Sequence, residues 1–318
     1  MDALALNFYF LRLSGLWYEE NERFGCAKKM YRFIVMVIIF YVTLTLIAKI
    51  AVSNSNIGDL TESHFVAMKY LALCFKIINF VFRRDNIIKI IRELKVVYCK
   101  ANSDEEAKIL AKHAKTSKWL FLCLMTLCSC NILVFVYSWS SKTISEKYSS
   151  LMTYQFYDTS NPEILYFTIS FNILAIIFCA VIHVSLDTTF VGLFMVITGQ
   201  LELNACRIEK LSRDDMLDMK SCVSHNILIR EVTKKVESLV IGVVIPFFLF
   251  GMGIVCTSIF QASKYNLFSY NFAWIWVFAV SSLQQVFIYC WFGNQLMLTI
   301  VKMSYTTLNL LNQVYERN

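Results

Sequence analysis

Residues 33–52 read FIVMVIIFYVTLTLIAKIAV, and Lys49 is the one charged side chain among them. A helix of this length rises about 30 Å, which matches the hydrocarbon core of a bilayer. We expect further spans of this kind at residues 65–82, 119–139, 164–184, 239–262 and 272–298. A weaker seventh candidate, residues 299–314, is short and follows the sixth span without a polar break.

The composition agrees with a membrane protein. Of the 318 residues 57% are hydrophobic and 17% are charged, and the mean hydropathy is +0.55. Soluble domains average about 45–50% apolar and about 25% charged residues, so this excess excludes an ordinary soluble enzyme. Nine Gly and two Pro leave little turn material for a β-barrel. The sequence therefore predicts an all-α, polytopic transmembrane helical bundle that forms a single domain over residues 1–318.

Basic residues between the spans indicate the orientation. The segments before span one, between spans two and three, and between spans four and five hold 22 Lys and Arg, against three in the alternate segments. Cytosolic loops carry such an excess, so we expect a cytosolic N-terminus. The net charge of +7 is thereby interpreted as topological, with membrane lipid as the surroundings and no nucleic-acid partner.

Catalytic and metal-binding motifs are absent from the sequence. It contains no G-x-S-x-G, H-E-x-x-H, P-loop or dinucleotide fingerprint, so no enzymatic activity and no cofactor are expected. All 11 cysteines fall in expected spans or cytosolic segments without partners at metal-ligand spacing. We interpret them as helix-packing residues.

Charged residues within or beside the spans have two interpretations. Lys49 and Lys69 lie near the outer ends of spans one and two, where their side chains can snorkel to the surface. Lys76, His183 and Asp187 lie deeper or nearer the inner face. An intramembrane charge is a candidate functional group, although an interhelical polar contact is favoured here over ion transport.

Aromatic residues make up 15% of the chain and gather in the outer halves of spans three, four and six. Interfacial belts and core packing account for such residues one at a time. Together they would line an apolar pocket for a small volatile or lipophilic molecule. The candidate lining residues are Phe135, Trp139, Phe167, Phe171, Trp274 and Phe278.

The cytosolic segments are expected to be helical. Residues 86–97 place Ile87, Ile90 and Leu94 on one apolar stripe. Ser103 followed by Glu106 is typical of a helix start at residue 104. We expect these helices to form a packed layer below the membrane.

Several ordered motifs resemble those of insect odorant receptors of the variable, ligand-tuned type. They include LRLSGLW at 11–17, FRRDNIIKIIREL at 82–94, QQVFIYCWFGNQL at 284–296 and KMSYTTLNLLNQV at 302–314. The expected orientation is the same as in that family.

The resemblance implies an odorant-gated cation channel subunit in the cell membrane of olfactory neurons. Such subunits have seven spans and form a hetero-tetramer with a common co-receptor. The odorant sits among spans two, three, four and six, which adds Met68 and Leu71 to the candidate ligand-binding residues. Leu308, Leu310 and Leu311 would form the pore gate by the same analogy.

The junction between spans six and seven departs from the family. Several dozen residues, which supply the cytosolic half of helix seven, separate GNQL from KMSY in the family, whereas five residues, Met297–Val301, separate them here. Five residues cannot return the chain to the bilayer, so we expect six spans and an incomplete seventh. A continuous helix over 272–314 would be about 64 Å long.

Other functions stay open at this point. The shortened junction allows a truncated isoform that does not conduct, and the wider superfamily includes taste-receptor-like channel subunits. A transporter is disfavoured because Pro246 and its neighbouring glycines have no counterpart in a second repeat.

The charge bias yields a direct prediction of sidedness. An epitope tag fused to Met1 should be invisible to antibody on intact cells and become visible after permeabilisation, because the basic segments hold the N-terminus in the cytosol. A tag in the segment 53–64, which holds no Lys or Arg, serves as the matched control and should label intact cells. Surface labelling at Met1 would contradict the expected topology.

Overall fold

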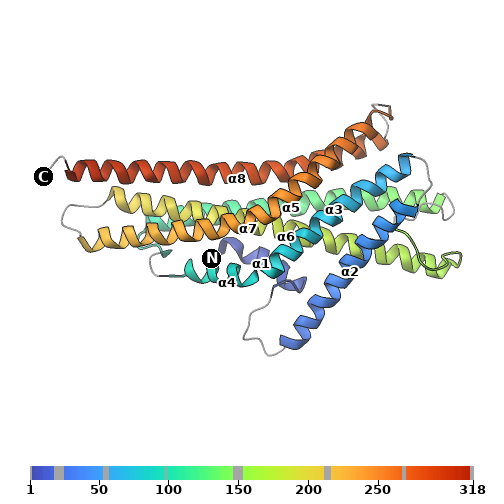
Figure 1. Cartoon of the computed structure of the whole chain (residues 1–318), viewed down its shortest axis with the longest axis horizontal. Coiled ribbons are helices and arrows are strands. Elements are labelled where there is room, and N and C mark those ends of the chain that lie inside the picture. The colour runs from blue at the N-terminus through green and yellow to red at the C-terminus, as the bar shows by residue number, and fades with distance from the viewer. Residues whose placement is uncertain are drawn as a thin grey trace.

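The computed structural model describes residues 2–17, 25–52, 57–96, 99–145, 153–210, 216–266 and 270–315. Over these residues the fold is an elongated bundle of helices, in which α8 runs along one edge and α2 leans away from the others (Figure 1). A 3₁₀ turn, η1, covers Asp2–Leu4. The α-helices are α1 (Ala5–Leu13), α2 (Gly25–Val52), α3 (Ile57–Phe82), α4 (Arg84–Glu93), α5 (Asp104–Ser145), α6 (Pro162–Glu209), α7 (Met216–Ala262) and α8 (Tyr270–Tyr315).

The expected all-α bundle is confirmed, and each of the six expected spans lies inside a different long helix. Five described helical segments are long and apolar enough to cross a membrane: Cys26–Val52, Asp104–Val134, Pro162–Glu209, Met219–Ala262 and Ile275–Asn309. The remaining expected span, residues 65–82, lies within the 26-residue helix α3. Backbone groups in hydrocarbon must be satisfied within the segment, which explains why these runs are helical.

The weak seventh span is not an element of its own. Residues 299–314 continue α8, a single helix of 46 residues. At 1.5 Å per residue its length is about 69 Å, roughly twice the hydrocarbon thickness. The sequence TIVKMSYTTLNLLNQV contains no Gly or Pro that would interrupt the helix. The expected junction between spans six and seven is therefore continuous helix.

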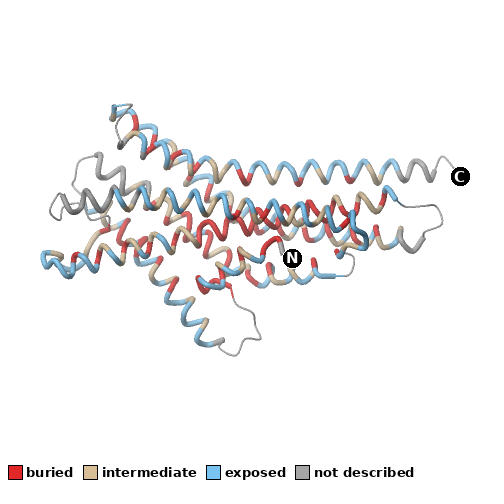
Figure 2. Tube along the Cα trace, turned by 180° about the vertical axis from the view of Figure 1, so that it is seen from behind, coloured by how far each residue is buried: buried red, intermediate tan, exposed pale blue. Residues whose placement is uncertain are grey.

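The core of the bundle is centred on α6. Every residue from Ile182 to Met195 is buried, and buried positions concentrate in the middle of the molecule (Figure 2). Polar side chains in this stretch bond to their own helix, as in the 2.6 Å bond from Thr189 Oγ1 to the Ser185 carbonyl. Gly192 allows close approach, because a Cβ there would clash with the Leu4 side chain. The N-terminal segment thus packs directly on α6.

The end of the bundle that includes α4 is also tightly packed. The expected helix start is confirmed, since the Glu106 amide donates to Ser103 Oγ at 3.3 Å. The Glu106 carboxylate binds Arg207 at 2.8 and 3.1 Å and also accepts from the Asn102 amide. Burial raises the pKa of the nearby Cys99 thiol to about 11, so the thiol stays protonated at neutral pH.

The Glu106–Arg207 contact joins α5 to α6 and gives a stability prediction. Glu106→Ala should lower the free energy of unfolding by about 2–3 kcal/mol, because it leaves a mostly buried guanidinium without its bidentate partner. Thermal unfolding of the purified chain in detergent measures the effect. Glu105→Ala is the matched control, because Glu105 forms an exposed pair with Lys210 and its loss should change little. Equal effects of the two substitutions would contradict this account.

Candidate ligand-binding site

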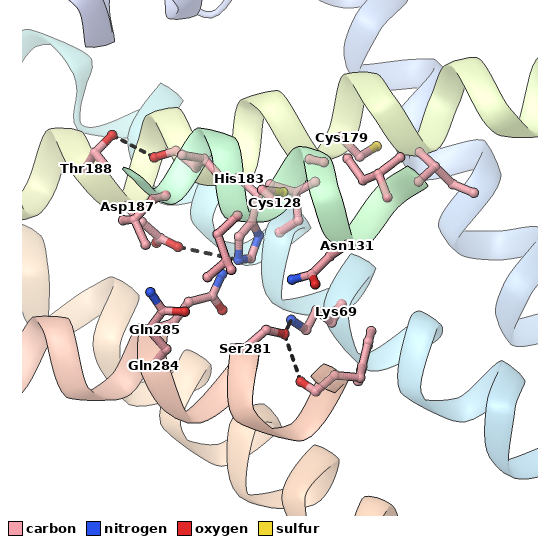
Figure 3. A pocket seen from close by; sticks show the side chains of 18 of the residues that line it. Lys69, Cys128, Asn131, Cys179, His183, Asp187, Thr188, Ser281, Gln284 and Gln285 are labelled. Atoms are coloured by element: carbon pink, nitrogen blue, oxygen red, sulfur yellow. Dashed lines mark hydrogen bonds and ion pairs between the residues drawn. The ribbon is translucent and has the colours of Figure 1, made fainter. Parts of the chain in front are cut away.

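A cavity lies between α3, α5, α6 and α8 in the interior of the bundle (Figure 3). The centre of a water molecule can reach about 190 Å³ of it. Its wall is mainly apolar, and the apolar lining includes Val66, Leu73, Leu124, Leu127, Ile132, Ile176, Ala180 and Ile288. The polar lining groups include Lys69, Asn131, His183, Asp187, Ser281, Gln284, Gln285 and Tyr289. An apolar cavity with a few converging polar groups is typical of a site for a small molecule.

A buried ion pair lies against one end of the cavity. Lys76 Nζ of α3 is 2.6 Å from Asp187 Oδ1 of α6, and Tyr289 of α8 donates to the same oxygen at 2.8 Å. His183 Nε2 lies 3.3 Å from Lys76 Nζ and 3.4 Å from Asp187 Oδ2. The Lys76 ammonium also sits 4.0 Å from the centre of the Phe247 ring of α7. Four helices therefore meet at this ion pair.

This cluster is an interhelical contact of the kind the sequence favours over ion transport. Lys76 is 1% exposed, so its charge would be very unfavourable without the Asp187 carboxylate. One residue further along α6, Thr188 accepts a 2.8 Å hydrogen bond from Asn7 of α1. The cluster thereby fixes the relative positions of three cavity-lining helices, and its neighbour ties the N-terminal helix to the same place.

Lys69 lies at a different part of the cavity wall. The expectation that it snorkels to the outer surface is wrong, because its Nζ points inward and donates to Ser281 Oγ of α8 at 3.2 Å (Figure 3). The same ammonium lies 4.5 Å from the centre of the Phe278 ring. Lys69 follows Val66 by three positions and precedes Leu73 by four, so one face of α3 carries all three into the cavity.

The structure places the sequence-derived ligand candidates in different surroundings. Phe278 lines the cavity. Met68 lies toward α7, where the end of its side chain approaches Gly253. Leu71 is half-buried beside the cavity-lining face of α3. Phe171 packs against the core, whereas Phe167 is 71% exposed. The side chains of Phe135, Trp139 and Trp274 lie outside the described residues. A ligand-binding role for this set stays a prediction.

The gate candidates all lie on the C-terminal part of α8. The Leu308 side chain is exposed, and those of Leu310 and Leu311 lie outside the described residues. Their role stays a prediction. In the part of the chain that the structure describes, no three His, Cys, Asp or Glu side chains gather as metal ligands would.

A family model described as "7tm Odorant receptor" matches residues 56–307. This range covers most of the helices that surround the cavity. The chain belongs to the insect odorant receptor family. It is therefore a multi-pass membrane protein of a receptor family rather than an enzyme, and the resemblance seen in its motifs is confirmed.

The chain is similar to a receptor of a mosquito over nearly its whole length. It is 20% identical to Odorant receptor Or1 of Anopheles gambiae over 342 residues, which cover 96% of this chain and 79% of the relative. The alignment is longer than the 318 residues of the chain, so the relative has internal residues that this receptor lacks. This agrees with a chain that is shortened internally.

Two solved structures share the fold. The insect olfactory receptor OR5 from Machilis hrabei has a TM-score of 0.79 at 16% identity, over 95% of this chain and 83% of the other. The structure of that protein in complex with eugenol has a TM-score of 0.82 at 16% identity, over 95% and 81%. The helical bundle of this odorant receptor is therefore that of insect olfactory receptors.

The buried ion pair gives a second stability prediction. Asp187→Asn should lower the free energy of unfolding by about 3–5 kcal/mol, because it leaves the Lys76 ammonium buried without an anion. The double variant Lys76→Met with Asp187→Leu should recover most of this loss. Asp85→Asn is the control, since that carboxylate is 89% exposed. Thermal unfolding in detergent checks all three, and a loss in the double variant as large as that in Asp187→Asn would contradict the pairing.

Proposed function

We propose that the chain is the odorant-binding subunit of an odorant-gated cation channel and acts with a common co-receptor. The cavity between α3, α5, α6 and α8 carries this proposal, because it lies between membrane helices and is lined mainly by apolar side chains. Such a wall suits a small volatile molecule that is held by shape and dispersion. The related receptor OR5, whose structure is described in complex with eugenol, supports the same ligand class.

The proposed orientation puts the N-terminus and α4 in the cytosol. The basic segments adjoin these elements, which supports this sidedness. The cavity then lies in the membrane-embedded part of the bundle, where an odorant dissolved in lipid can reach it. Assembly with the co-receptor as a hetero-tetramer would place the C-terminal part of α8, with its leucines, near the partner subunits.

The continuous α8 favours a second candidate function. A helix of 46 residues without a break provides no separate seventh span to line a pore. A subunit of this form would bind the odorant and the co-receptor without conducting. The two functions differ in whether current accompanies binding, so one experiment separates them.

Filling the cavity should weaken the response to odorants. Ala180→Phe adds a ring within the cavity, whereas Leu174→Phe changes an exposed position of the same helix, α6, and is the matched control. Each variant is co-expressed with the co-receptor, and currents are recorded during application of an odorant panel that includes eugenol. We expect at least a tenfold loss of sensitivity for Ala180→Phe and none for the control, at equal surface expression.

The outcomes separate the candidates. Odorant-evoked current that depends on Ala180 supports the channel subunit. Pull-down of the co-receptor and odorant binding without current support the subunit that does not conduct. Failure of every odorant to bind the wild-type chain would contradict both.

A further inference from the structure

Lys69 is a cation in the cavity wall that has no anionic partner among the residues the structure describes. Its Nζ donates to the neutral Ser281 hydroxyl at 3.2 Å and faces the Phe278 ring at 4.5 Å. No acidic side chain of the described segments lies within ion-pair distance of it. Among the described lining residues the one carboxylate is that of Asp187, and it is engaged by Lys76 and Tyr289. The geometry thus leaves a positive site that nothing in the described bundle neutralises.

The surrounding groups increase the preference of this site for an anion. The Lys76–Asp187 pair has no net charge, so Lys69 sets the sign of the cavity when it is protonated. An uncompensated charge between membrane helices is unfavourable, and an opposite charge that enters the same space is strongly attracted. Amide groups of Asn131 and Gln285 also line the cavity, and Asn131 lies beside Lys69 (Figure 3). They add donors for a second ligand oxygen.

We infer that the preferred ligand is a small carboxylic acid whose carboxyl group pairs with Lys69 and whose hydrocarbon chain occupies the apolar part of the cavity. This inference rests on the proposed function, because it names the ligand class of the same site. The acid enters through lipid as the neutral molecule. It then gives its proton to the amine if Lys69 is neutral, or leaves it to bulk water if Lys69 is already protonated. Either route ends in the same carboxylate–ammonium pair.

An ester or alcohol of the same size lacks this interaction. Either could accept a hydrogen bond from Lys69, but neither supplies a counter-charge. Charge-assisted hydrogen bonds are shorter and about twice as strong as neutral ones, and low dielectric strengthens them further. The cavity should therefore bind an acid more tightly than its neutral isomer, because only the acid supplies the counter-charge for Lys69.

The test uses the full chain in lipid nanodiscs at pH 7. The probes are hexanoic acid, its isomer methyl pentanoate, hexan-1-ol and hexylamine, and dissociation constants come from the ligand-dependent shift of thermal unfolding. We expect the wild type to bind hexanoic acid at least about tenfold more tightly than methyl pentanoate. Lys69→Met should abolish this difference, and Lys69→Glu should shift the preference to hexylamine.

Controls separate ligand recognition from folding. Lys264→Met is the matched control, because Lys264 also lies over a phenylalanine ring, that of Phe260, but is remote from the cavity. It should retain the preference for the acid. Lys69→Arg keeps the cation and should also retain it, so the comparison with Lys69→Glu remains available if Lys69→Met fails to fold.

Two results would overturn the inference. One is equal binding of hexanoic acid and methyl pentanoate to the wild type, and the other is an undiminished acid preference in Lys69→Met and Lys69→Glu. Either would leave the proposed function standing, because neutral volatiles would still bind. If neither these probes nor any member of the odorant panel binds the wild type, the proposed function fails and this inference fails with it.

Discussion

The pair formed by Lys76 and Asp187 holds together the part of the bundle on which the cavity depends. In a membrane, helices gain little from hydrophobic association because lipid tails are as apolar as the side chains, so polar contacts and close packing decide how helices meet. Here one ammonium of α3 faces a carboxylate of α6, which in turn accepts from a phenol of α8. Three of the four cavity walls are therefore set by a single electrostatic arrangement. The fourth wall, α5, is fixed to α6 at another level by Glu106 and Arg207.

Much of the architecture follows from the sequence through simple physics. Apolar runs of about 20 residues become helices because hydrocarbon offers no other partner for their backbone groups. Ser103 and Glu106 mark a helix start because their side chains satisfy amides that the helix leaves free. The apolar stripe through Ile87 and Ile90 is buried, because packing against neighbouring helices removes these side chains from water. The spans, the helix start and the apolar stripe each depend on residues that are close together in the sequence, so a sequence pattern can predict them.

The cavity was harder to predict because it depends on which helix face meets which neighbour. The aromatic residues near the outer ends of the spans predict both Phe278 and Phe167 as lining residues. Phe278 does line the cavity, whereas Phe167 is mostly exposed. A sequence alone does not distinguish a lipid-facing aromatic from one that faces a partner helix. On α3 the cavity-lining face passes through Val66, Lys69 and Leu73, so neighbours only one or two positions away point elsewhere. The sequence places Lys69 near the end of a span, but it does not show the rotation of α3 about its axis, which turns this side chain toward Ser281 in the cavity.

The unbroken course of α8 has a mechanical consequence. Phe278 and Tyr289 touch the cavity, and the helix then runs on to Tyr315 without a joint. If these last 26 residues move as one rigid rod of about 39 Å, a tilt of about 3° near Tyr289 displaces the end of the helix by about 2 Å. A ligand that displaces the α8 wall of the cavity would thereby move the C-terminal end of the same helix. The displacement would be transmitted by the tilt of one helix rather than by a series of rearranged contacts.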